Sequence, residues 1–199
     1  HRVPHERLAV ALAAQLGLVP GVPVVGFVGR LSADKGLGML ARARQLLAAR
    51  GVDHQLLIVG PVEGGDSDEL RGAGRPPIEP GYVPDPARYY QLIDVLCLPT
   101  YREGFPNVVL EAAAAGVPTV TTDATGAVDS VVDGVTGFAI PVDDTERLAD
   151  RLEELVSHPD VRQRMGAAAR ARVESAFRRE IVWANTEAEY RRLYDGVRR

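Results

Sequence analysis

Short apolar runs alternate with helix-like segments along the chain, and this alternation constrains the fold more than any other feature of the sequence. Runs of roughly four to eight apolar residues are typical of buried strands, whereas apolar residues three or four apart mark one face of a helix. Strands alternating with helices predict βαβ units and a parallel sheet covered on both faces. The sequence therefore predicts an α/β fold with a doubly wound, mostly parallel, Rossmann-like sheet of about six strands and extra C-terminal helices.

The predicted elements indicate where a ligand should bind. Strands are expected at 24–28, 55–59, 78–83, 95–98, 119–121 and 137–140. Helices are expected at 36–50, 87–92, 106–115, 145–157, 159–175 and 179–197. Most of 60–80 is expected to be loop. Ligands of such sheets bind outside the carboxyl ends of the strands. The loops at 29–30, 60–61, 83–84, 100–105 and 123–126 should therefore converge on one rim.

The first rim loop, 29–36, carries two cations and leads directly into a helix. Arg30 follows Gly29, and Lys35 is the only lysine among 23 Lys and Arg residues. Helix N-termini favour anions, and the two cations add full charges. The loop therefore predicts a diphosphate site, and a solvated loop with two surface charges is the alternative. The chain has neither a Walker A loop nor a GxGxxG fingerprint, which excludes those nucleotide sites.

The second rim segment, 101–111, carries two carboxylates. Glu103 lies in the loop, and Glu111 shares a helix face with Asn107, four residues earlier. Gly104 permits close backbone approach to a ligand. The amides of Phe105, Asn107 and Val108 should be free at the helix start. Because the rest of this helix is apolar, we expect it to be buried, and a buried Glu111 then needs a partner. A ligand is one such partner, and a cap or a neighbouring Arg is the alternative.

Composition narrows the function further. The net charge of −4 argues against nonspecific nucleic-acid binding, which needs a basic surface. The single cysteine, Cys97, lies in an apolar run and is expected to be a small buried side chain. His1, His5, His54 and His158 lack metal-ligand spacing and are expected at the surface or in caps, and no Asp-x-Asp occurs. We therefore expect no metal and no cofactor. No apolar run is long enough for a transmembrane helix.

Together these motifs resemble the family 4 retaining glycosyltransferases of GT-B architecture. The resemblance covers roughly 22–199. It rests on Gly29-Arg-x4-Lys-Gly36, Gly81-Tyr-Val83, Glu103-x7-Glu111, Gly116-Val-Pro118 and Asp133-Gly-Val-Thr-Gly137. The segments 104–111 and 121–130 look most like enzymes that build bacterial capsule, exopolysaccharide or lipid-linked glycans. The resemblance implies hexosyl transfer, with retention, from a nucleotide-diphosphate sugar, UDP-sugar by preference, to a glycan or lipid-linked acceptor.

The resemblance also implies roles for the rim residues. Arg30 and Lys35 would hold the donor diphosphate and stabilise it as leaving group, with Gly29 beside them. Glu103 would contact the donor sugar, assisted by amides of 104–107, and Glu111 would bind the ribose hydroxyls. Backbone near Val83 would meet the nucleobase. Glu103, Arg30 and Lys35 are thus the expected catalytic residues. Many relatives have Glu where this chain has Asp129, which is therefore left out of the site.

The chain is expected to be a single nucleotide-sugar-binding domain, 1–199, forming the C-terminal half of a GT-B fold. Residues 1–22 would be a linker and helix from an N-terminal domain that this sequence lacks. Residues 178–199 would be a helix that packs back on that domain, which leaves its apolar positions, such as Ile181, Trp183 and Tyr194, partly exposed here. The chain alone is then expected to bind donor weakly and to transfer no sugar. The resemblance places the enzyme in the cytoplasm, with peripheral membrane association of the full-length form left open.

Two other functions remain open from the sequence. A related GT-B enzyme, such as a phosphorylase or a nucleotide-sugar epimerase, would share the fold, but an epimerase needs a positioned His or acid pair that this half does not show. A noncatalytic binding or interaction module, such as one that binds nucleotide sugars, would share the fold. Calorimetry with UDP separates an interaction module of this kind from the donor-binding half of a glycosyltransferase.

Overall fold

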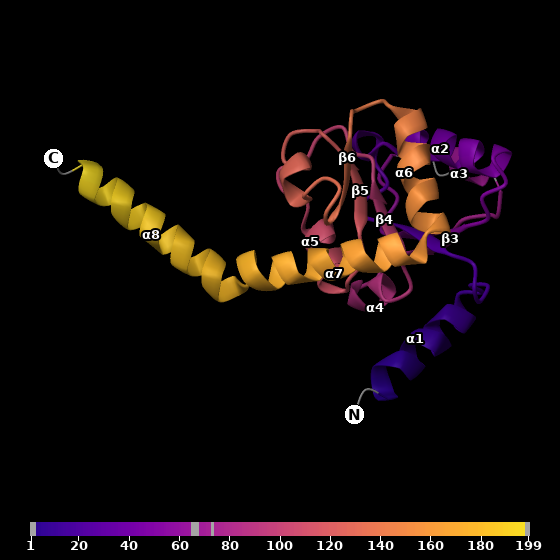
Figure 1. Ribbon diagram of the computed structural model, residues 1–199, viewed down its shortest axis with the longest axis horizontal. Helices are drawn as coiled ribbons and strands as arrows, with labels where there is room; N and C mark the ends of the chain where they lie inside the picture. Colours follow the sequence, from indigo (N-terminus) through magenta and orange to yellow (C-terminus); the bar gives the residue numbers. More distant parts are fainter. Residues whose placement is uncertain (1–2, 65–67, 73, 198–199) are drawn as a thin grey trace.

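The computed structural model describes residues 3–64, 68–72 and 74–197 and contains one six-stranded parallel sheet. The strands lie in the order β3-β2-β1-β4-β5-β6, and β4, β5 and β6 can be followed one after another in Figure 1. This is the order of a doubly wound nucleotide-binding sheet, and the predicted fold is confirmed. The strands are β1 (Val24–Val28), β2 (Gln55–Val59), β3 (Ile78–Gly81), β4 (Val95–Leu98), β5 (Thr119–Thr122) and β6 (Gly137–Ile140).

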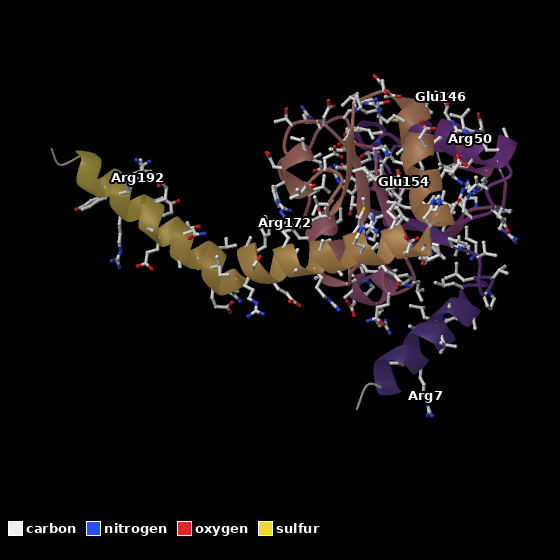
Figure 2. The ribbon with its side chains drawn as sticks, viewed as in Figure 1. Arg7, Arg50, Glu146, Glu154, Arg172 and Arg192 are labelled. Atoms are coloured by element: carbon white, nitrogen blue, oxygen red, sulfur yellow. The ribbon has the colours of Figure 1, made fainter. Side chains whose placement is uncertain are left out.

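Helices cover both faces of the sheet. They are α1 (Val3–Gln15), α2 (Leu37–Ala49), α3 (Asp68–Arg71), α4 (Ala87–Tyr90), α5 (Asn107–Ala114), α6 (Thr145–Ser157), α7 (Pro159–Ala176) and α8 (Arg179–Val197). Helices α3 and α6 pack against α2 on one face, and α4 and α7 pack against α5 on the other (Figure 1). Ion pairs also join α2 to α6 on the first face. Arg50, at the end of α2, pairs with Glu146, Asp150 and Glu153 of α6, and Figure 2 labels Arg50 and Glu146.

The core lies between the sheet and these helices. Every residue of β1, β2, β4 and β5 is buried, as expected for strands covered on both faces. Cys97 is fully buried in β4, which confirms the prediction, and burial raises the pKa of its thiol far above the usual value. An inert buried thiol follows, because the thiolate is the reactive form.

The described part of 60–80 is mostly loop, as predicted, with one helical turn, α3. Two sequence predictions need correction. The third strand ends at Gly81 rather than at 83, because Gly81 adopts a left-handed conformation with φ of 76° that turns the chain out of the strand. His54 is buried at 4% exposure rather than lying at the surface. Its imidazole fits inside because the Val52 carbonyl and the Arg44 guanidinium meet its two nitrogens.

His158 caps the junction of α6 and α7, as predicted. Its Nδ1 lies 2.9 Å from the Glu154 carbonyl oxygen, which also accepts a hydrogen bond from the His158 amide at 3.1 Å where α6 ends. His1 and the side chain of His5 lie outside the described part of the chain.

Helices α1 and α8 extend away from the body of the domain, one at each end of the chain (Figure 1). Large apolar side chains of α8 are correspondingly open to solvent, with Trp183 64% and Tyr194 59% exposed. This confirms the expectation of exposed apolar positions on the last helix, and Ile181 is half-buried. Within the described residues, no helix has both the length and the apolar character needed to cross a bilayer.

Candidate donor site

The strand order reverses between β1 and β4, and the loops that follow these two strands lie side by side. The amide of Tyr101, after β4, donates to the carbonyl oxygen of Asp34, after β1, at 2.9 Å. The Thr100 hydroxyl donates to the same carbonyl at 3.1 Å. Open α/β sheets bind ligands at the carboxyl ends of the strands where the order reverses. The two rim segments predicted from the sequence therefore meet at the expected place.

Two glycines allow this close approach. Gly36, with φ of 70°, faces the carbonyl oxygen of Pro99 so closely that a Cβ would lie 1.9 Å from it. Gly126, in the loop after β5, faces Gly104 in the same way, because a Cβ on Gly126 would lie 2.0 Å from the Gly104 carbonyl oxygen. The amide of Glu103 also donates to the carbonyl oxygen of Thr125 at 3.2 Å. The backbones of the loops after β1, β4 and β5 are thus in close contact, at positions where a residue with a Cβ would clash.

Lys35 and Glu103 form an ion pair between the first two of these loops. The Lys35 ammonium lies 2.5 Å from Glu103 Oε1, and the two side chains are only 12% and 16% exposed. Asp34 Oδ2 lies 3.5 Å from the same ammonium. The Ser32 hydroxyl donates to Asp34 at 2.6 Å, and this bond, with help from Lys35, lowers the pKa of Asp34 against the opposing effect of burial. The lone lysine is therefore a half-buried cation held by carboxylates.

Arg30 also has a carboxylate partner. Its Nη1 lies 2.9 Å from Glu63 Oε2 in the loop after β2, and both side chains are about half exposed. The backbone holds the two loops together, because the amide of Leu31 donates to Pro61 and the amide of Glu63 donates to Leu31. The hydrogen bond and charge of Glu63 raise the pKa of Arg30. Glu63 has no signal in the sequence, since it lies in a loop of weak periodicity.

Helix α5 presents Asn107 and Glu111 to solvent, which corrects the expectation that Glu111 is buried. Only the opposite side of α5, around Val109, Ala112 and Ala113, faces the core. The short helix leaves one polar stripe open, because α4 and α7 cover only its other sides. The shared face of Asn107 and Glu111 is confirmed by their joint exposure.

Glu111 has a partner that the sequence does not indicate. The Tyr90 hydroxyl, at the end of α4, donates to Glu111 Oε2 at 2.7 Å. This partner is neither a cap nor an arginine. At the start of α5, the amides of Phe105, Asn107 and Val108 find no acceptor among the described residues. They are available to an anion or hydroxyl, as predicted.

An aromatic contact supports the loop from the other side. The ring centroids of Phe105 and Phe177 lie 5.6 Å apart, and Phe177 directly follows α7. The Arg172 guanidinium stacks 4.9 Å from the Phe177 ring and donates to the carbonyl oxygens of Asp129 and Ser130 in the loop after β5 (Figure 2). The end of α7 thus braces two rim loops. Asp129, which is not among the predicted site residues, takes part through its backbone.

The remaining predicted residues lie at the same rim. Gly29 follows β1, and its amide donates to the carbonyl oxygen of Val59 in β2 at 2.9 Å. Val83 follows β3, two strand positions from β1, and is half-buried. Among the described residues, no three His, Cys, Asp or Glu side chains are placed to hold a metal ion. The rim thus combines two cations, four carboxylates (Asp34, Glu63, Glu103 and Glu111) and free amides, a set suited to a phosphorylated, polyhydroxylated ligand.

Comparison with known proteins agrees with the fold. A family model described as glycosyl transferases group 1 matches residues 22–158. The capsular polysaccharide biosynthesis glycosyltransferase CapM of Staphylococcus aureus is 37% identical over 172 residues, which are 84% of this chain and 45% of CapM. HepE of Anabaena, solved in complex with UDP-glucose, is 26% identical with a TM-score of 0.76, over 92% of this chain and 51% of HepE.

One solved structure is a single domain. The C-terminal domain of the group 1 family protein LpcC from Francisella tularensis shares the fold, with a TM-score of 0.72 and 22% identity, over 83% of this chain and 91% of that domain. The chain therefore spans nearly all of an isolated domain but about half of CapM and HepE. Because the family model matches more than half of the residues, the chain belongs to the glycosyl transferases group 1 family, and its sheet is a Rossmann-like domain of the GT-B kind.

Proposed function

We propose that this chain is the donor-binding half of a retaining glycosyltransferase. The enzyme would transfer a hexosyl group from a UDP-sugar to a glycan or lipid-linked acceptor in the cytoplasm. The observation that carries the proposal is the Lys35–Glu103 pair between the β1 and β4 loops, with Arg30 and the free amides of α5 beside it. These groups match the parts of a nucleotide sugar, which has a diphosphate, a ribose and a hexose.

The charges of the rim suit the proposed chemistry. Breaking the sugar–phosphate bond leaves negative charge on the nucleoside diphosphate and positive charge on the sugar ring. Arg30 and Lys35 would stabilise the leaving diphosphate, so that this chain needs no metal for the step. The exposed Arg30–Glu63 pair costs little to open, because water and salt screen such surface pairs. Arg30 can therefore exchange Glu63 for phosphate readily.

The two glutamates would have different tasks. Glu103 would contact hydroxyls of the donor sugar and keep its ion pair with Lys35. The pair would thus hold the carboxylate toward the sugar and the ammonium toward the diphosphate. Glu111, exposed on α5, would accept hydrogen bonds from the ribose hydroxyls. The UDP-glucose complex of HepE, a relative 26% identical, supports a UDP-sugar as donor. Because this chain spans about half of HepE and CapM, we place the acceptor site in the other half of the whole enzyme.

Calorimetric titration of the 199-residue chain with UDP tests the site directly. We expect binding in the millimolar range or tighter, and a loss of about tenfold or more with Lys35→Met, which removes the charge but keeps the length of the side chain. Arg192→Gln is the matched control, because it removes a cation on α8, far from the rim (Figure 2). A folded chain that binds no UDP, or an unchanged affinity in Lys35→Met, would contradict the proposal.

The transfer reaction requires the full-length enzyme. There, Lys35→Ala and Glu111→Ala should each lower kcat/KM by about a hundredfold or more, the usual effect of removing one group that stabilises a transition state. Product analysis by NMR would determine the anomeric configuration. Near-normal rates in both variants would exclude the assigned roles, and an inverted product would exclude retention.

A further inference from the structure

Tyr90 is a buried residue that touches the proposed site only through its hydroxyl. It ends α4 and is 1% exposed, and its ring lies within the core. Its hydroxyl donates to Glu111 Oε2 at 2.7 Å. Glu111 itself is exposed on α5. One end of this hydrogen bond is thus fixed by core packing, and the other end is a side chain open to solvent.

The chemistry of the pair makes Tyr90 a permanent donor. Burial, and then the hydrogen bond and charge of Glu111, raise the pKa of the Tyr90 hydroxyl well above its usual value. The phenol therefore keeps its proton at any working pH. A hydroxyl on a packed ring has only the C–O rotation left to it, so it defines the position of the carboxylate it binds.

An exposed glutamate normally samples several rotamers, and a ligand that fixes one of them loses the corresponding entropy. The Tyr90 hydroxyl removes part of that freedom in advance. It occupies one lone pair of Oε2, so that Oε1 and the remaining lone pair of Oε2 stay able to accept. Two acceptors on one rigid carboxylate suit a pair of adjacent hydroxyls.

We propose that Tyr90 is a positioning residue that orients the Glu111 carboxylate to accept the 2′- and 3′-hydroxyls of the donor ribose. The proposal rests on the proposed function, in which Glu111 faces the ribose. It assigns selection of ribose over deoxyribose to a residue that does not itself touch the nucleotide.

Tyr90→Phe is the direct test, because it removes one oxygen atom and leaves the ring. Tyr89→Phe is the matched control, since Tyr89 precedes it on α4, is also buried, and has no hydrogen bond through its hydroxyl among the described residues. Calorimetry of the 199-residue chain with UDP should show about tenfold weaker binding for Tyr90→Phe and less than about twofold change for Tyr89→Phe.

A second nucleotide separates positioning from general support of the fold. For 2′,3′-dideoxy-UDP, which lacks the hydroxyls, wild type and Tyr90→Phe should bind equally weakly. In a Glu111→Ala background, Tyr90→Phe should have no further effect on UDP binding. The positioning role would be overturned if Tyr90→Phe weakened the binding of both nucleotides equally. It would also be overturned if the effects of Tyr90→Phe and Glu111→Ala on UDP binding were additive.

The remaining outcomes are also decisive. Unchanged UDP binding in Tyr90→Phe, with wild type binding normally, would overturn the role of Tyr90 and leave the proposed function standing. Absence of UDP binding in wild type would overturn the proposed function itself. Because the exposed Glu111 can take water in place of the phenol, Tyr90→Phe is expected to fold. If Tyr90→Phe did not fold, the Tyr90 hydroxyl would act in stability of the fold, and the proposal would be overturned.

Discussion

The Lys35 ammonium lies 2.5 Å from Glu103 Oε1, and this pair joins the loop after β1 to the loop after β4. The two residues are far apart in sequence, and both side chains are mostly shielded from solvent. The Coulomb attraction between the two charges is stronger than in a surface pair, because little water screens it. It also means that a diphosphate bound at Lys35 would lie close to the negative charge of Glu103.

Glu103→Gln should therefore change nucleotide and sugar binding in opposite directions. Removing the carboxylate relieves repulsion with the diphosphate, and UDP should bind up to about tenfold more tightly. UDP-glucose should lose the additional affinity that its sugar provides. The Kd for UDP divided by the Kd for UDP-glucose should therefore fall toward one. Calorimetry with both ligands measures this ratio. Weaker binding of UDP itself would show that Glu103 supports the diphosphate site instead of opposing it.

Gly126→Ala should disturb the site, because its Cβ would lie 2.0 Å from the carbonyl oxygen of Gly104 and 2.4 Å from that of Glu103. Gly134→Ala is the matched control, since Gly134 has a similar φ of 72° but nothing within 4 Å of the position that its Cβ would take. The left-handed conformation alone costs a residue with a Cβ about 1–2 kcal/mol. Both variants should lose that stability, and Gly126→Ala should lose more.

Thermal and chemical unfolding measure the difference between these two variants, and UDP titration measures its effect on the site. Only Gly126→Ala should weaken UDP binding, because only that variant displaces the backbone of the Glu103 loop. Equal unfolding free energies for the two variants would mean that the backbones of the rim loops after β4 and β5 are not in close contact.

The strands and helices can be predicted well because their signals are local. Apolar runs such as 24–28 and 55–59 define buried strands, and the rule for parallel sheets then brings the rim loops together. The exposure of Glu111 cannot be predicted in this way. It depends on which sides of α5 are covered by α4 and α7, and periodicity within α5 holds no information on that. For the same reason the sequence does not indicate Tyr90, whose partner lies 21 residues away.

Pairings between loops are equally beyond the reach of sequence patterns. Glu63 meets Arg30 only because Leu31 and Val62 bridge two loops that follow adjacent strands. A lone histidine is polar, which favours the surface for His54. Its burial depends on Arg44, whose guanidinium also donates to the carbonyl oxygens of two other residues, Leu70 and Arg75. Such networks are set by tertiary packing, and no spacing rule describes them.

His54 should make the stability of the domain depend on pH. Burial lowers the pKa of His54, and the nearby charge of Arg44 acts in the same direction, against the Val52 carbonyl. In the unfolded chain the pKa is about 6.5, so below that pH the unfolded state binds a proton that the folded state does not. The free energy of unfolding should therefore be constant above about pH 7 and fall as the pH drops below about 6.5.

Urea unfolding between about pH 5 and 7.5 measures this slope, and His54→Gln should reduce it, because the variant has no titrating group there. The same acid slope in wild type and His54→Gln would mean that other groups control the pH dependence.

Trp183 offers a test of how α8 is used in the whole enzyme. It is the only tryptophan of the chain and is 64% exposed on α8, next to Val182 and in the same helix as Tyr190 and Tyr194. Exposed apolar side chains on a helix that leaves the domain are expected to pack on another part of the protein. We therefore predict that α8 packs on the half of the enzyme that CapM and HepE have in addition to the region matched by this chain.

Tryptophan fluorescence measures this packing, because the emission of an indole depends on its exposure to water. In the 199-residue chain, Trp183 should emit as a solvent-exposed indole and should be quenched readily by iodide. In a longer form that includes the other half, the emission should shift to the blue and quenching should fall. Trp183→Phe in the longer form provides the background from any further tryptophans. Equal Trp183 emission and quenching in the short and long forms would contradict the prediction, because an indole buried against the second half cannot stay as open to iodide as one that faces water.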